Sequence, residues 1–289
     1  MTAKNRNSAI LLMHCPDDKG IVANITKFIN DNNGNIISLD EHVDRLDKVF
    51  YMRVEWELDG FLIPQDKIAG VFGPSIAERY KMNWNIFFSS RMPRMAIFVS
   101  KLSHCLYDIL PRAFTGEWSV EIPLIISNHP DLEPIASQFN IPFYYIEKNN
   151  ENKIEQERRE LELLKKNDIS FIVLARYMQI LSKEFISEYP NRIINIHHSF
   201  LPAFPGSKPY HSAYERGVKI IGATSHYVTA ELDAGPIIDQ DIVRVSHRDT
   251  IDKLMIKGRD VEKLVLSRAI LMHIQHRTLL YNNRAVVFY

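Results

Sequence analysis

FIVLARYMQILSKEFISEYPNRIINIHH, residues 171–198, sets two short apolar runs on either side of a polar, helix-like segment. The runs at 171–175 and 193–196 have the length of buried strands. Strands of this kind, alternating with helical crossovers, are typical of a parallel sheet that is covered by helices. The stretch therefore predicts an α/β architecture for this part of the chain.

The same alternation extends outward in both directions. Further strands are expected at 95–100, 122–127, 141–146, 220–228 and 236–243. The charged stretch 151–168 has leucines at helical spacing and is interpreted as a helix with a solvated face. Residues 250–282 are expected to be helical, with an apolar stripe made of Val261, Leu264, Val265, Ala269 and Met272. We predict a Rossmann-like, mostly parallel α/β domain over residues 95–289.

The first part of the chain has a different pattern. A strand-like run at 9–14 is followed by helical spacing over 20–32, two further strand-like runs, a second helix at 61–81 and a closing strand at 84–88. The second helix is expected to bury Ile68, Phe72, Ile76 and Tyr80 on one face. The order βαββαβ predicts a ferredoxin-like domain over residues 1–88, and 89–94 is interpreted as a linker.

Composition excludes several classes of function. Lys and Arg together number 35, as do Asp and Glu, so no net charge favours nucleic acid or an anionic membrane. The N-terminal apolar run lacks the features of a signal peptide, and no stretch approaches the roughly 18 apolar residues of a membrane span. The two cysteines, Cys15 and Cys105, are far apart, which fits a reducing cytoplasm.

The densest polar cluster within apolar sequence begins with NIHHSFLPAFPG at 195–206. Asn195 and His197 are two positions apart, so on a strand both side chains point to the same face. They would lie at the carboxyl end of that strand, where open α/β sheets bind ligands. An amide beside a histidine can hold an oxyanion and supply a proton. The turn-rich stretch at 201–209 is expected to form a wall of the site.

The second half of the candidate site is GATSHYVTAELDAGPII at 222–238, with His226 in a strand-like run and Asp233 in a tight loop. A carboxylate near two histidines suits acid/base chemistry. Each residue alone also has a structural explanation, such as a cap, a turn former or a core histidine. A metal site made of His197, His198 and His226 lacks ligand spacing, and no GxSxG motif supports a serine nucleophile. We predict an enzyme without a metal or a cofactor.

NIHHSFLPAFPG and PYHSAYERGVKIIGATSHYVTAELDAGPIIDQ, residues 209–240, closely resemble the folate-dependent formyltransferase fold family. The resemblance implies that Asn195, His197, His226 and Asp233 are the catalytic set. ARYMQILS at 175–182 resembles the segment that surrounds the pteridine ring in that family. The implied pteridine contacts are main-chain groups of Met178, Gln179, Ile180, Leu181, Ala230, Glu231, Leu232 and Asp233.

The N-terminal unit resembles an ACT domain, an amino-acid-sensing module, and the combination of the two domains resembles the formyltetrahydrofolate deformylases. That resemblance continues through 100–110 and 245–270, with small departures at Glu41 and Ala234. It implies hydrolysis of 10-formyltetrahydrofolate to tetrahydrofolate and formate, in one-carbon metabolism and in formate supply for purine biosynthesis. Formyl transfer to an amine such as glycinamide ribonucleotide, or a catalytically idle amino-acid and folate sensor, are the alternatives.

Two further expectations concern regulation and specificity. The ACT resemblance implies a homo-oligomer and an amino-acid effector near Asp17, Gly20 and Asn33. Transferases of this fold that use a phosphorylated acceptor resemble one another in a glycine-rich turn, whereas the stretch 100–108 has no glycine. Bulky Leu102, His104 and Leu106 are expected to fill the acceptor pocket, with His104 and Cys105 lining what remains.

Overall fold

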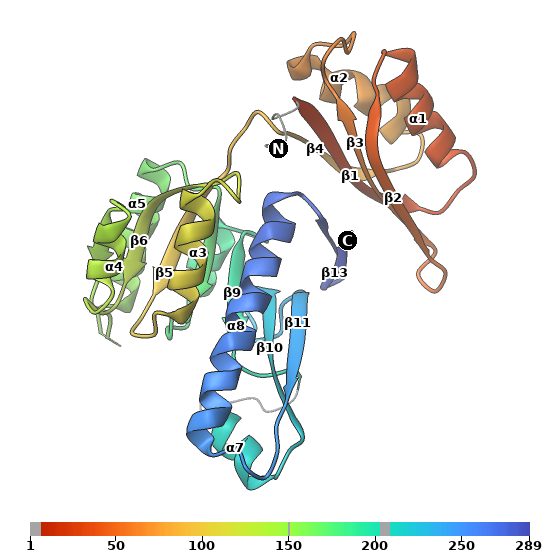
Figure 1. Ribbon diagram of the computed structural model, residues 1–289. Coiled ribbons are helices and arrows are strands. Elements are labelled where there is room, and N and C mark those ends of the chain that lie inside the picture. The colour runs from red at the N-terminus through yellow and green to blue at the C-terminus, as the bar shows by residue number, and fades with distance from the viewer. Residues whose placement is uncertain (1–6, 150, 203–208) are drawn as a thin grey trace. The chain divides into compact units, whose positions relative to one another are not determined.

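The computed structural model describes residues 7–149, 151–202 and 209–289 (Figure 1). The chain divides into two compact units, of which the first contains the chain up to Met92 together with Phe288–Tyr289, and the second contains Pro93–Val287. Among the described residues, no helix is long and apolar enough to cross a membrane.

The first unit is a four-stranded antiparallel sheet with helices packed against it. Its elements are β1 (Ser8–Pro16), α1 (Ile21–Asp31), β2 (Ile36–Asp44), β3 (Val49–Glu57), α2 (Ile68–Phe72) and β4 (Asn83–Phe88), and the sheet order is β2-β3-β1-β4. Apolar residues of both helices and of all four strands form one core. The βαββαβ order predicted from the sequence is confirmed, and the fold is ACT-like.

The second helix of this unit is shorter than expected. A 3-10 turn at Gln65–Lys67 precedes α2, which passes into a π-helical turn at Gly73–Ala77. Pro64 has an extended backbone, with ψ of 141°, so the helix cannot begin at residue 61. The predicted face is nevertheless correct, because Ile68, Phe72, Ile76 and Tyr80 are all buried.

The second unit contains a seven-stranded sheet of order β11-β10-β9-β8-β5-β6-β7. Its strands are β5 (Arg94–Val99), β6 (Glu121–Ser127), β7 (Phe143–Tyr145), β8 (Phe171–Ala175), β9 (Ile193–His197), β10 (Ile220–Tyr227) and β11 (Ile237–Arg244). Strands β5 to β9 run parallel, while β10 and β11 are antiparallel to their neighbours. The helices are α3 (His104–Phe114), α4 (Glu133–Gln138), α5 (Lys153–Lys166), α6 (Lys183–Glu188), α7 (Pro209–Glu215) and α8 (Ile251–Ile274). The predicted mostly parallel α/β fold is confirmed.

The C-terminal end differs from the expectation of helix over 250–282. The long helix α8 ends at Ile274, and β12 (Thr278–Tyr281) and β13 (Arg284–Val287) form a hairpin. Asn282 and Asn283 both have positive φ, which is the geometry of a two-residue hairpin turn. Within α8 most of the predicted stripe is inside the protein, but Leu264 is half exposed.

The charged helix α5 is not solvated along its whole polar face. Glu157 and Glu160 are buried, and the Nζ atom of Lys148 lies 2.8 Å from Oε2 of Glu160. The hydroxyl of Tyr177 donates a hydrogen bond to Oε1 of Glu160 over 3.2 Å. A buried carboxylate requires such partners, because burial removes its hydration. The simple solvated-face interpretation is therefore wrong for these two residues.

Strand register brings the candidate site together. Leu174 of β8 lies opposite Asn195 of β9 in the parallel pair. On the other side of β9, His226 lies opposite Asn195 and Thr224 lies opposite His197 in the antiparallel pair with β10. The sheet thus places the C-terminal ends of β8 and β9 beside the C-terminal half of β10.

The centre of this sheet supports the site, so removing side-chain volume there should destabilise the protein. Ile97 of β5 is fully buried in the core of the second unit. Ile97→Ala should lower the free energy of unfolding by about 2–5 kcal/mol, through lost burial and a residual cavity. The control is Ile154→Ala on α5, where the isoleucine is 75% exposed. Urea unfolding curves that show equal stability for both variants would contradict this packing.

Candidate active site

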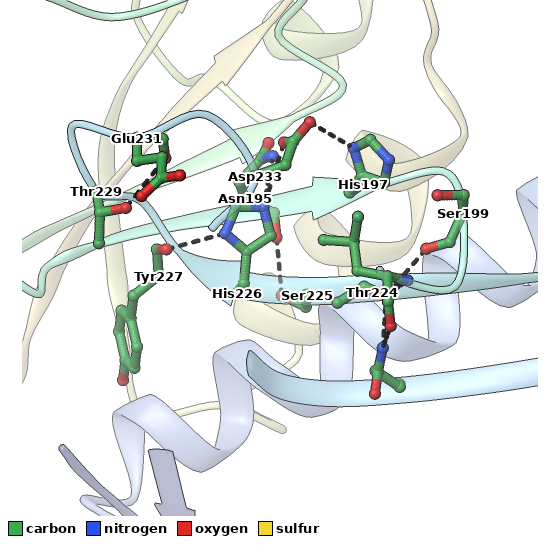
Figure 2. A network of polar contacts seen from close by, with 12 residues as sticks. Asn195, His197, Ser199, Thr224, Ser225, His226, Tyr227, Thr229, Glu231 and Asp233 are labelled. Atoms are coloured by element: carbon green, nitrogen blue, oxygen red, sulfur yellow. Dashed lines mark hydrogen bonds and ion pairs between the residues drawn. The ribbon is translucent and has the colours of Figure 1, made fainter. Parts of the chain in front are cut away.

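Asp233 is placed by a tight turn between β10 and β11 (Figure 2). Its own backbone is left-handed, with φ of 55°. Two residues later, a Cβ atom on Gly235 would lie 1.8 Å from the carbonyl oxygen of Tyr227, so no larger residue fits there without a shift of the backbone. The turn is thereby pressed against the end of β10, and it directs the Asp233 carboxylate toward His197 and His226.

Asp233 is held as a carboxylate by its two histidine neighbours. The Oδ2 atom lies 3.3 Å from Nδ1 of His197, and the Oδ1 atom lies 3.7 Å from Nε2 of His226. Interaction with His197, and then with His226, holds the pKa of Asp233 well below its usual range, although partial burial opposes this. An ionised Asp233 can stabilise positive charge on His197 or accept a proton.

His226 makes its hydrogen bonds to other groups. Its Nδ1 donates to the carbonyl oxygen of Tyr227 over 2.9 Å, because a carbonyl can only accept. In the neutral ring Nε2 is then an acceptor, and Asn195 Nδ2 lies 3.2 Å away to donate to it. The 3.7 Å separation from Asp233 is long for a hydrogen bond, so His226 acts on that carboxylate more weakly than His197 does. His226 orients Asn195, whose second N–H has no partner in the described part of the chain.

His197 ends β9 with one ring nitrogen available. Its Nε2 atom is buried and has no hydrogen-bond partner among the described residues, while Nδ1 faces Asp233. The adjacent His198 is a different case, because burial and then the charge of Arg176 lower its pKa to about 4. At neutral pH His198 is therefore uncharged.

Metal-ligating geometry in the described part of the chain is found in a set of residues other than the predicted histidine trio. Donor atoms of His104, Cys105 and Glu262 lie within 4.8 Å of one another. Burial, with a smaller contribution from Glu262, raises the pKa of the Cys105 thiol well above its ordinary value. Arg176 also lies against Glu262, with 3.5 Å between Nε and Oε2. A protonated thiol beside an arginine is a poor ligand set, since the thiolate is the form that binds metal.

The segments expected to hold a pteridine ring are largely exposed. Met178, Ile180 and Leu232 have exposed fractions of 55%, 62% and 64%, whereas Leu181 is buried in a core cluster against which Val228 also packs. Ala230 and Glu231 are exposed and Gln179 is half-buried. Some of the main-chain groups are already used. The N–H of Met178 donates to Ser100 Oγ over 3.1 Å, and the carbonyl of Glu231 accepts from Thr229 Oγ1 over 3.1 Å.

The loop after β5 differs in part from the expected filled pocket. Leu106 is fully buried and Cys105 nearly so, both within the core under the sheet. Leu106 therefore supports α3 and does not enter an acceptor pocket. His104 is turned toward Glu262, with 2.7 Å between Nε2 and Oε2. Of the wall expected at 201–209, residues 203–208 lie outside the described part of the chain.

Sequence reasoning missed Arg176, Tyr210 and Glu262 as polar residues near this site. Tyr210 donates to Glu262 Oε1 over 2.7 Å, and Arg176 contacts the same carboxylate. The available signal was the position of Arg176, directly after the apolar run 171–175 that forms β8. Glu262 offered no signal, because it lies in a helix that is rich in charged residues.

The three residues expected to bind an effector lie in the first unit and are exposed. Gly20, with φ of 84°, precedes α1, and no side chain caps that helix end. Asn33 follows the other end of α1 and donates from Nδ2 to the carbonyl of Gly60 over 2.9 Å. An 11-residue helix is roughly 16 Å long. One small amino acid therefore cannot contact Asp17, Gly20 and Asn33 within one chain.

Comparison with known proteins covers both units. Residues 93–270 match the family model for formyl transferase. A formyltetrahydrofolate deformylase of Synechocystis is 56% identical over 97% of this chain and 98% of its own length, and one of Bacillus subtilis is 45% identical over 98% and 95%. The crystal structure of a formyltetrahydrofolate deformylase from Pseudomonas syringae has a TM-score of 0.95 and 44% identity, over 98% of this chain and 95% of that chain.

Similarity to transferases is confined to a smaller share of the chain. The structure of glycinamide ribonucleotide transformylase 1 from Symbiobacterium toebii has a TM-score of 0.65 and 29% identity, over 71% of this chain and 98% of that chain. The deformylases match at higher identity and span both units of the fold. The chain therefore belongs to the formyltetrahydrofolate deformylase family of formyl transferase-fold enzymes.

Proposed function

We propose that this chain hydrolyses 10-formyltetrahydrofolate to tetrahydrofolate and formate. The observation that carries the proposal is the pairing of ionised Asp233 with buried His197, next to an Asn195 whose second N–H has no partner among the described residues. This set combines a proton acceptor, a proton donor and a neutral hydrogen-bond donor, which hydrolysis of an amide-like bond requires.

In the proposed reaction, water attacks the formyl carbon and its C–O bond forms as Asp233 receives or relays the departing proton. The former carbonyl oxygen becomes an oxyanion. Asn195 Nδ2 and protonated His197, through its unpartnered Nε2, donate hydrogen bonds to that oxygen.

Collapse of the tetrahedral intermediate breaks the bond between the formyl carbon and N10. The electron pair of that bond stays on N10, which needs a proton in order to leave as the amine. The proton taken up by the Asp233 network supplies it, and the carbon departs as formic acid, which ionises to formate. No step requires an electron donor or a metal ion, because each is a proton transfer or an addition or elimination at carbon.

Asp233→Asn should keep the shape of the turn but remove the carboxylate. Loss of a general base typically costs about 10²–10⁴ in rate, so kcat should fall by that range with little change in folate affinity. Release of tetrahydrofolate, followed by absorbance, measures it. The control is Asp131→Asn, an exposed aspartate outside the site. If the Asp233 variant keeps more than about a tenth of the wild-type rate, Asp233 is not the general base.

We infer from the loop after β5 that water is the only acceptor of the formyl group. The stretch 100–108 lacks the glycines that would let backbone N–H groups close on a phosphate. His104 and Glu262 are also engaged with one another there. Glycinamide ribonucleotide at millimolar concentration should therefore neither stimulate turnover nor become formylated. Detection of its formylated product in stoichiometric amounts, by mass spectrometry, would instead establish a transferase.

The ACT-like unit is proposed to bind a small amino acid that changes activity, in a cytoplasmic homo-oligomer. Support comes from the start of α1, where Gly20 leaves the first backbone N–H groups without a side-chain cap and Asp17 is close in sequence. A carboxylate suits such a helix end. Assembly without regulation is the alternative function of this unit.

A calorimetric and kinetic screen of the twenty amino acids tests this. At least one should bind and change the rate, and Asp17→Asn should weaken that binding, whereas Asp59→Asn at another exposed turn should not. If no amino acid binds or alters turnover, the unit serves assembly alone.

A further inference from the structure

Arg176 occupies a position that its backbone and its surroundings both make costly. Its φ is 61°, in the left-handed region that residues other than glycine rarely adopt. Its side chain is only 9% exposed, so the guanidinium has lost nearly all its hydration. Strain and an interior charge at one residue generally indicate a functional constraint.

The charge of Arg176 is incompletely satisfied by the protein. Nε and Nη1 are buried and have no hydrogen-bond partner among the described residues. The carboxylate nearest to Nε, that of Glu262, lies 3.5 Å away, and His104 and Tyr210 already hydrogen-bond it at 2.7 Å each. Leaving buried donors unpaired is unfavourable, so a small acceptor is expected to complete the site.

Arg176 also lies beside the reacting groups. Arg176 directly follows the end of β8, and His197 ends β9, which pairs with β8 in parallel, so both residues lie at the same edge of the sheet. The electrostatic effect of Arg176 on His198 agrees with this position, because His198 directly follows His197. The buried Nε2 of His197 also has no partner within the described ranges. Two neighbouring strand ends therefore present unsatisfied donors from buried side chains.

We propose that Arg176 and His197 form a binding site for a small carboxylate, and that its occupant is the formate produced by the reaction. This inference rests on the proposed hydrolysis. Formate keeps the oxygen that His197 holds in the tetrahedral intermediate, so cleavage of the C–N10 bond leaves the anion within reach of the arginine. A site this buried admits a three-atom anion more readily than the glutamyl carboxylates at the far end of a folate.

If this site exists, the enzyme should retain formate after the reaction. Formate should bind weakly but specifically, with a dissociation constant on the order of 1 mM or higher, since so few atoms supply little binding energy. It should inhibit deformylation over the same concentration range. Charged hydrogen bonds contribute most of that affinity, so removing the guanidinium should weaken formate binding at least about tenfold.

The test is formate binding to the full chain, followed through the formate proton by saturation-transfer NMR at constant ionic strength. Arg176→Met should lose at least about tenfold in affinity, while Arg176→Lys, which keeps the charge, should lose less. Arg158→Met, at an exposed arginine of α5, is the matched control and should bind like the wild type. Thermal unfolding of each variant establishes that it is folded.

Two results would overturn the inference: equal formate affinity in folded Arg176→Met and the wild type, or no wild-type binding up to about 100 mM. The deformylase assay is run separately. If the protein hydrolyses the substrate but formate binding does not depend on Arg176, the proposed formate site is wrong and the proposed hydrolysis stands. If formate binding depends on Arg176 but the protein shows no turnover, the small-carboxylate site is supported and the proposed hydrolysis is contradicted.

Discussion

The contact between the Asp233 carboxylate and His197 is the interaction on which the site depends. It exists because the turn at 231–236 folds back on β10, which the absence of a side chain at Gly235 permits. The antiparallel pairing of β9 and β10 then sets His226 against Asn195, so that one histidine orients the amide and the other contacts the Asp233 carboxylate. A parallel β10 would bring neither contact, because its side chains would meet β9 in a different register.

A second group of charges, which includes Arg176 and Glu262, acts on His198, the residue that follows His197. Burial opposes ionisation of Glu262, but the hydrogen bond from His104 and the charge of Arg176 outweigh it, and the pKa of Glu262 is lowered. Glu262 comes from α8, far along the chain from His104 and Arg176. The packing of this one long helix on β9, β10 and β11 therefore brings Glu262, from the C-terminal part of the chain, close to the strands that hold the candidate site.

The periodicity of apolar residues was sufficient to predict both sheets. It also placed Asn195 and His197 on the same face of one strand. Asn195 and His197 could be placed together because strand geometry repeats every two residues. The C-terminal hairpin was missed because its strands are four residues each and follow a long helical pattern without interruption. Arg176 and Glu160 could not be recognised as buried, since burial of a charged residue depends on partners that are distant in sequence, such as Glu262 and Lys148.

The central claim is that water, activated by protein groups alone, attacks the formyl carbon. The direct measurement is turnover of 10-formyltetrahydrofolate in buffer made with ¹⁸O-water and a strong chelator, with mass analysis of the formate. The account predicts undiminished turnover and one ¹⁸O atom in each formate released. Formate without the label, or activity that is lost and then restored specifically by zinc or iron, would contradict it.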